Sequence, residues 1–202
     1  EIRLSLVGSE MCIRDRMHAV VVAYVLTVAA CIPLSGWLAD RFGVRNTYFA
    51  AIIIFTLASL GCGLSQTLNQ LILFRILQGV GGALLLPVGR LAMLKLIPRT
   101  QFLAAMSLMS LAGLIGPLIG PTLGGWLVEV ATWHWVFLIN IPMGILGILV
   151  TFKAMPNATE PTVKAFDFSG FVLLVFAMVG LSLGIEHLAS REYSKWFSIG
   201  LL

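Results

Sequence analysis

The residues with the clearest chemical potential are polar side chains inside long apolar stretches. Arg75 lies about one turn into an apolar run that begins at Leu71, and Gln78 follows three residues later on the same helical face. An arginine in such surroundings is costly unless its side chain reaches the aqueous surface or faces a water-filled cavity. Of these two explanations we favour the cavity. Asn140, two residues before Pro142, weakens another apolar run and is expected to expose backbone carbonyls there.

Arg75, Gln78 and Asn140 are therefore candidates for a substrate or proton pathway. Arginine keeps its proton in proteins, so Arg75 can attract an anion or lower the pKa of a nearby carboxylate, but it cannot carry the proton itself. From residue 17 to residue 152 no acidic side chain lies well inside an apolar run. We expect any proton-carrying carboxylate to lie in a segment outside this sequence, with Glu186-His187 as a weaker candidate.

A charged turn, Gly36-Trp-Leu-Ala-Asp-Arg-Phe-Gly-Val-Arg45, is the second candidate. Gly36 is expected to let a helix end pack closely, and Gly43 to permit a tight reversal at positive φ. Asp40 is expected just before the next helix, where its charge suits the positive end of the helix dipole. Arg41 and Arg45 would hold the turn in the cytoplasm. The turn is either a simple hairpin or an electrostatic latch that opens as the protein changes shape.

A helix face without side chains is the third candidate. In the run from 113 to 126, glycines recur every fourth residue, and Pro117 and Pro121 share that spacing. Each proline removes a backbone donor and bends a helix, while the glycines let a neighbouring helix approach closely. The alternative is the ordinary packing of small residues. The residues assigned to this face are Gly116, Gly120, Pro121, Gly124 and Gly125.

Composition sets the class of protein. Hydrophobic residues make up 59% of the chain and charged residues 11%, whereas soluble domains carry roughly 25% charged residues. The chain is therefore expected to be all-α, a polytopic transmembrane helix bundle. The net charge of +4 is spread over short loops, which argues against nucleic-acid binding. Metal-ligand spacings, phosphate-binding loops and nucleophile–base pairs are all lacking, which argues against an enzyme. The loops are also too short for the recognition domain of a receptor.

The expected organisation follows from the apolar runs and the polar breaks between them. We expect residues 1–16 to be a non-native leader, similar to a translated adapter scar. Membrane-spanning helices are expected over 17–153 and a cytoplasmic linker over 154–166. A further span and the start of another are expected over 167–202. The expected spans are 17–38, 46–64, 71–94, 102–128, 135–152 and 167–185, with another beginning at 196. Cys31 and Cys62 lie about 10 Å apart in depth, so we expect no disulfide between them.

Lysine and arginine set the expected orientation. The basic turns at 41–45, 95–99 and 153–164 alternate with the turns at 65–70 and 129–134, which contain no lysine or arginine. Basic short loops face the cytoplasm, so the first span is expected to begin outside. We therefore expect at least one earlier helix in the full protein.

Several of these stretches together resemble one family. The turn from Gly36 to Arg45 resembles the loop between the second and third helices of the major facilitator superfamily, with Val44 in place of a basic residue. Arg75-x-x-Gln-Gly-x-Gly-x-Ala83 resembles its fourth-helix motif. Gly116-x-x-x-Gly-Pro-x-x-Gly-Gly125 is similar to the fifth-helix motif of its proton antiporters, except that Ser107 stands where the longer motif has glycine. The stretch 133–142 resembles the 14-helix drug:proton antiporter branch.

The resemblance implies a transporter of 12 or 14 helices, of which this chain supplies about helices two to seven and the start of the eighth. It implies proton-coupled efflux of drugs or small amphiphilic molecules by alternating access, in a bacterial inner membrane, driven by the proton gradient and without a cofactor or metal. The implied partners are the lipid bilayer, a small-molecule substrate and protons, with no obligate protein partner. An exporter of organic acids or other metabolites on the same fold remains an alternative. A membrane-embedded enzyme or receptor is an alternative from a different class of protein.

Overall fold

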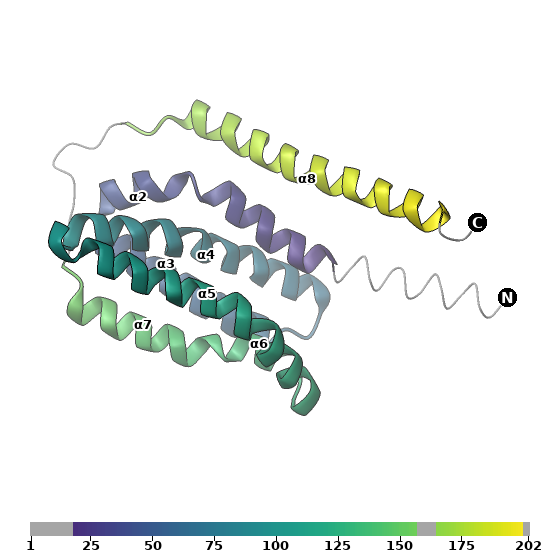
Figure 1. Ribbon diagram of the computed structural model, residues 1–202, viewed down its shortest axis with the longest axis horizontal. Coiled ribbons are helices and arrows are strands. Elements are labelled where there is room, and N and C mark those ends of the chain that lie inside the picture. The colour runs from purple at the N-terminus through teal and green to yellow at the C-terminus, as the bar shows by residue number, and fades with distance from the viewer. Residues whose placement is uncertain (1–17, 157–164, 200–202) are drawn as a thin grey trace.

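The computed structural model describes residues 18–156 and 165–199, and it is helical through most of this length. The expected leader at 1–16 and most of the expected linker lie outside the described residues. Figure 1 shows the helices running along one common direction. They are His18–Cys31, α2 (Leu34–Phe42), α3 (Val44–Gly63), α4 (Leu68–Leu96), α5 (Arg99–Val130), α6 (Trp135–Leu138), α7 (Asn140–Ala154) and α8 (Phe168–Ile199).

Four helices are long and apolar enough to cross a membrane, and a bent pair makes up to five. The four are Val44–Gly63, Leu68–Leu96, Arg99–Val130 and Trp135–Ala154. They confirm the membrane-spanning helical class that the composition predicts. The first expected span is not a single straight helix, since His18–Cys31 and α2 meet at an angle of 57°. Pro33 lies at this break, where its missing N–H interrupts the hydrogen bonds of the helix.

Helix α3 forms the centre of the bundle. Nine of its twenty residues are buried, and it packs against α2, α4, α6 and α7. At position 81 of α4, a glycine lies directly against the backbone of α3. A Cβ added there would lie 2.7 Å from the backbone nitrogen of Phe55 and 2.8 Å from the carbonyl oxygen of Ala51. Glycine is therefore the residue that lets the α3 and α4 backbones touch.

Helix α4 begins three residues earlier than the sequence analysis predicts. The Thr67 hydroxyl accepts a hydrogen bond from the backbone N–H of Gln70, and the Gln70 side chain accepts one from the backbone N–H of Thr67. This reciprocal capping box turns the expected polar loop into the first turn of the helix. Arg75 consequently lies about two turns inside α4 rather than one, and so deeper in the bundle.

Helix α8 also differs from the prediction. We expected a span ending near 185, a mixed-charge turn, and a new span from 196, but the backbone is one continuous helix from Phe168 to Ile199. Residues 186–195 contain no glycine or proline, so nothing in that stretch forces the helix to end. The expected N-cap at Asp167 is confirmed, because its carboxylate accepts hydrogen bonds from the Gly170 N–H and the Ser169 hydroxyl. These bonds, the Gly170 one foremost, lower the pKa of Asp167.

The turns after α2 and α4 and the end of α7 gather at one end of the bundle, at the left of Figure 1. The turns at 64–67 and 131–134 lie at the other end, where the His134 ring nitrogen lies 3.2 Å from the Ser65 carbonyl oxygen. Alternating turns thus share an end, as the expected orientation requires. Cys31 and Cys62 are both free thiols, as expected.

Candidate functional site

A chain of polar side chains crosses the interior of the bundle. The Arg75 guanidinium donates to the Gln78 side-chain oxygen at 3.1 Å. The Gln78 amide nitrogen donates to the Ser59 hydroxyl at 2.6 Å, and the Asn140 amide nitrogen donates to the same hydroxyl at 3.1 Å. The structure thus brings the three predicted pathway residues, Arg75, Gln78 and Asn140, into one hydrogen-bonded cluster, which we call the polar cluster, with Ser59 as its fourth member.

Three helical features position this cluster. The three-residue spacing of Arg75 and Gln78 puts both on one face of α4, as predicted. Ser59 faces them from α3. Asn140 is the first residue of α7, directly after the interruption at Ile139 that separates α6 from α7. The predicted weak point around Asn140 and Pro142 thus coincides with a local interruption at Ile139, although the backbone there keeps helical angles. The Asn140 amide is directed to Ser59 in the interior.

Arg75 is held away from the aqueous ends of the bundle. Its guanidinium carbon lies 5.1 Å from the centre of the Tyr24 ring and 4.9 Å from the centre of the Phe137 ring. Its hydrogen bond runs to Gln78, one turn farther into α4, rather than toward the nearer helix end. The geometry is that of an internal arginine, not of one that extends to the membrane surface.

The charge of Arg75 is not balanced by the residues around it. Within the described ranges, no salt bridge joins Arg75 to an acidic side chain. Its Nε atom is buried and has no hydrogen-bond partner there. Aromatic faces and an amide oxygen stabilise the cation but do not neutralise it. An internal cation of this kind calls for a negative partner, either a carboxylate or an anionic solute.

The charged turn at 36–45 forms two of the contacts that a latch needs. Asp40 forms a salt bridge of 3.0 Å with Lys95, which joins the end of α2 to the end of α4. Arg45 donates to the carbonyl oxygen of Phe152 at 2.9 Å, and its guanidinium carbon lies 5.1 Å from the Phe152 ring centre. The turn therefore links the ends of α2 and α3 to the ends of α4 and α7. Gly43 adopts the predicted positive φ, at 87°.

Two expectations for this turn are wrong. Asp40 lies in the last turn of α2, not before α3, because α2 continues to Phe42 and Gly43 caps α3. At that position the helix dipole opposes a carboxylate, and Lys95 supplies the compensating charge. Gly36 mediates no close packing with the residues that the structure describes, since none of their atoms lies within 4 Å of a Cβ added there. Arg41 lies over the Trp37 ring, with its guanidinium carbon 5.6 Å from the ring centre.

Reversing the Asp40–Lys95 pair tests this latch. Asp40→Lys should lower the melting temperature by at most a few degrees, because a partly exposed pair contributes about 0.2–1 kcal/mol. Lys95→Asp in the same protein should restore it, since the double variant regains opposite charges. The melting temperatures of the wild type and the variants are compared by thermal unfolding in detergent. Arg41→Glu, which also changes the charge of this turn, serves as the control. Additive losses in the double variant would show that the contact does not form.

The glycine face of α5 has no neighbour in the part of the chain that the structure describes. Nothing lies within 4 Å of a Cβ added at Gly116, Gly120, Gly124 or Gly125, and α5 has no buried residues. Pro117 and Pro121 both lie inside the helix, which remains continuous from Arg99 to Val130. The helix partner that the spacing predicts is not among the described helices.

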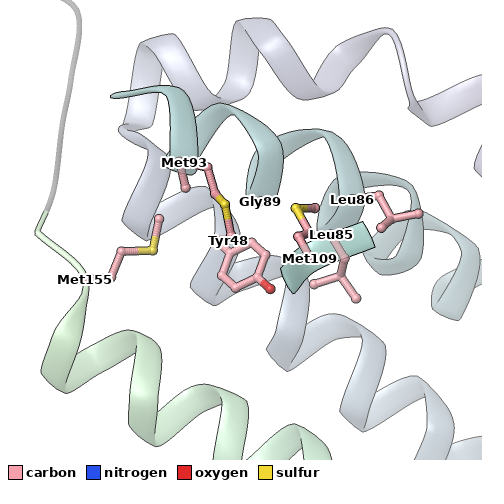
Figure 2. Close-up of a pocket in the computed structure, with 8 residues that line it drawn as sticks. Tyr48, Leu85, Leu86, Gly89, Met93, Met109 and Met155 are labelled. Carbon is pink, nitrogen blue, oxygen red and sulfur yellow. The ribbon is translucent and has the colours of Figure 1, made fainter. Parts of the chain in front are cut away.

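An open apolar hollow of about 340 Å³ lies between α3, α4, α5 and the end of α7. Figure 2 shows Tyr48 between the methionines that line it, Met93, Met109 and Met155. The Tyr48 phenol is the one titratable group in the lining. The hollow offers adaptable apolar contact rather than acid–base chemistry, and it shares no residue with the polar cluster. The hollow is not evident from the sequence, because its lining comes from four separate segments.

Within the residues that the structure describes, no group of three or more His, Cys, Asp or Glu side chains could hold a metal ion. The features that remain are apolar spans, an internal cation on a polar cluster, and a charged turn that ties helix ends. Together they define a polytopic membrane protein with a polar cluster inside its helix bundle. The family model described as Major Facilitator Superfamily matches residues 13–201, and the chain belongs to that superfamily.

Relatives and solved structures agree with this assignment. The chain is 59% identical over 185 residues to the "Putative multidrug resistance protein MdtD" of Salmonella dublin and 58% identical to that of Salmonella paratyphi B. The match covers 92% of this chain and 39% of each relative, so the chain spans about two fifths of their length.

Two solved transporters share the fold. A crystal structure of the peptide transporter POT, an E310Q mutant in complex with sulfate, matches with a TM-score of 0.62 at 18% identity, covering 85% of this chain and 36% of that one. The inward-open xylose transporter XylE from E. coli matches with a TM-score of 0.56 at 16% identity. This match covers 87% of this chain and 45% of the XylE chain. Both solved neighbours are named as transporters.

Proposed function

We propose that this chain forms part of a secondary active transporter that exports small amphiphilic molecules in exchange for protons. The observation that carries the proposal is the unbalanced charge of Arg75 inside the bundle. A carboxylate from another segment of the full protein would complete this site. Arg75 would lower the pKa of that carboxylate and so set the pH at which the proton leaves. The similarity to multidrug resistance proteins supports drugs and related amphiphiles as the cargo.

In this mechanism the two halves of the full protein rock around a central cavity. Substrate enters from the cytoplasm or the inner leaflet, and a proton returns inward when the cavity opens outside. A membrane potential of about 100 mV supplies about 2.3 kcal/mol per charge, enough for a roughly 50-fold gradient. The turn at 36–45 would stabilise the outward-open state, and the α5 glycine face would pack where the halves close and limit leakage. The protein would lie in the bacterial cytoplasmic membrane.

The second candidate is an exporter of organic acids on the same fold. The observation that favours it is again the absence of an acid next to Arg75 among the described residues. An anionic substrate would then supply the negative partner itself, and Arg75 would bind cargo rather than tune a carboxylate.

Transport assays on the complete reading frame separate the two candidates. The reading frame is expressed in a bacterial host whose own exporters have been deleted, and the cells are exposed to amphiphilic dyes such as ethidium and, separately, loaded with benzoate. Export of the dye that stops when an uncoupler removes the proton gradient supports drug antiport. Export of benzoate alone supports the second candidate, and failure to export either solute contradicts the proposal.

A further inference from the structure

We propose that Ser59 is the positioning residue of the transport site, holding Gln78 and Asn140 so that Gln78 can orient Arg75. This inference rests on the proposed function for its consequence in transport, but its geometry stands on the cluster alone. Ser59 is fully buried, Gln78 is 1% exposed, and the hydroxyl receives amide donors from two different helices. Ser59 thereby connects α3, α4 and the break before α7 at a single oxygen.

The orientation of the Gln78 amide follows from its two neighbours. A guanidinium only donates hydrogen bonds, so the atom of Gln78 that meets Arg75 must be the oxygen. The amide nitrogen is then directed to Ser59, whose hydroxyl oxygen has two lone pairs and accepts from both Gln78 and Asn140. Without the hydroxyl, the Gln78 nitrogen has no acceptor there and the amide loses its fixed direction.

Loss of the fixed Gln78 orientation would affect Arg75, because the other residues around its guanidinium fix the direction of that group only loosely. Its guanidinium carbon lies over the Tyr24 and Phe137 rings, and a contact with a ring face does not fix the direction of an N–H group as a hydrogen bond does. Tyr24, in the first helix, and Cys62, in α3, are the titratable groups near it. Among the described residues, Gln78 is the one that forms a hydrogen bond with the guanidinium. Ser59 therefore acts on Arg75 at a distance, through Gln78.

A double-mutant cycle on thermal stability tests the geometry without any substrate. The complete protein is purified as wild type, Ser59→Ala, Arg75→Ala and the double variant. Among the described residues no hydrogen bond joins Ser59 to Arg75 directly, so we expect coupling between them to pass through Gln78. The loss of melting temperature in the double variant should be clearly smaller than the sum of the single losses. Additive losses would overturn the positioning role. If Ser59→Ala does not fold, Ser59→Cys takes its place, because a thiol is only a weak hydrogen-bond acceptor, and Ser59→Thr, which keeps the hydroxyl, should leave the melting temperature nearly unchanged.

The pH profile of ethidium export tests the consequence. With Arg75 misplaced, the carboxylate that it tunes should have a higher pKa, so the midpoint of the profile for Ser59→Ala should move upward by about one pH unit. Thr56→Val is the matched control, because the Thr56 hydroxyl is buried one turn away but bonds only its own helix, at Ile52. An unshifted profile for Ser59→Ala, or an equal shift for Thr56→Val, contradicts the proposal. If the wild type exports no ethidium, the proposed function fails while the stability cycle still decides the role of Ser59.

Discussion

Arg75→Ala is expected to reduce efflux about 10- to 1,000-fold while leaving the protein in the membrane. A neighbouring arginine lowers the pKa of a carboxylate by about 1–3 units, so its removal shifts proton release by the same amount. Near neutral pH, most transporters would then hold their proton and fail to complete the cycle. Efflux is measured in cells and divided by the amount of protein in the membrane fraction.

Two variants make this prediction specific. Arg75→Lys should remain impaired, since a compact ammonium does not reproduce the planar, delocalised guanidinium that contacts both the Tyr24 and Phe137 rings while it donates to Gln78. Arg90→Ala removes the same charge from an exposed position of the same helix and should leave most of the efflux. Normal efflux by Arg75→Ala would remove Arg75 from the mechanism.

Gly81→Ala is expected to have the largest effect on stability. Its Cβ would meet backbone atoms of Phe55 and Ala51 at 2.7–3.0 Å, and backbone cannot rotate away as a side chain can. Helices α3 and α4 would have to separate, at a cost of about 1–3 kcal/mol or more. Because α3 carries Ser59 and α4 carries Gln78, the same displacement should also disturb the polar cluster. Thermal unfolding in detergent measures the loss.

Gly147→Ala is the matched control, in a different helix contact of the same bundle. A Cβ at Gly147 would lie 3.5 Å and 3.7 Å from side-chain atoms of Ile52, which is ordinary van der Waals contact. This variant should keep its melting temperature or gain slightly, since alanine favours helix more than glycine does. Equal stability of the two variants would mean that α3 and α4 do not approach as closely as described.

The local features of the site could be predicted from the sequence. Spacing alone placed Arg75 and Gln78 on one helical face, and the need for a tight reversal predicted the positive φ of Gly43. Both depend on residues within one turn of each other. The start of α4 was misplaced because the polar residues after Ser65 suit a loop and a capping box equally well, and the hydrogen bonds of Thr67 decide between them.

Contacts between helices were harder to predict. Ser59 was missed because a serine within an apolar helix is usually a small packing residue, and nothing in the spacing shows that Gln78 and Asn140 converge on it. For the same reason the Lys95 partner of Asp40 was not foreseen, although both residues were noted in basic turns. Asn140 was found only because a nearby proline marks a weak point in the helix.

Proton movement coupled to substrate tests the central claim most directly. Inside-out membrane vesicles are prepared from cells that express the complete reading frame, their interior is acidified by respiration, and a pH-sensitive dye reports the internal pH. Addition of ethidium should release protons from wild-type vesicles and not from Arg75→Ala vesicles. Ethidium uptake that leaves the internal pH unchanged and continues after an uncoupler is added would contradict proton-coupled export.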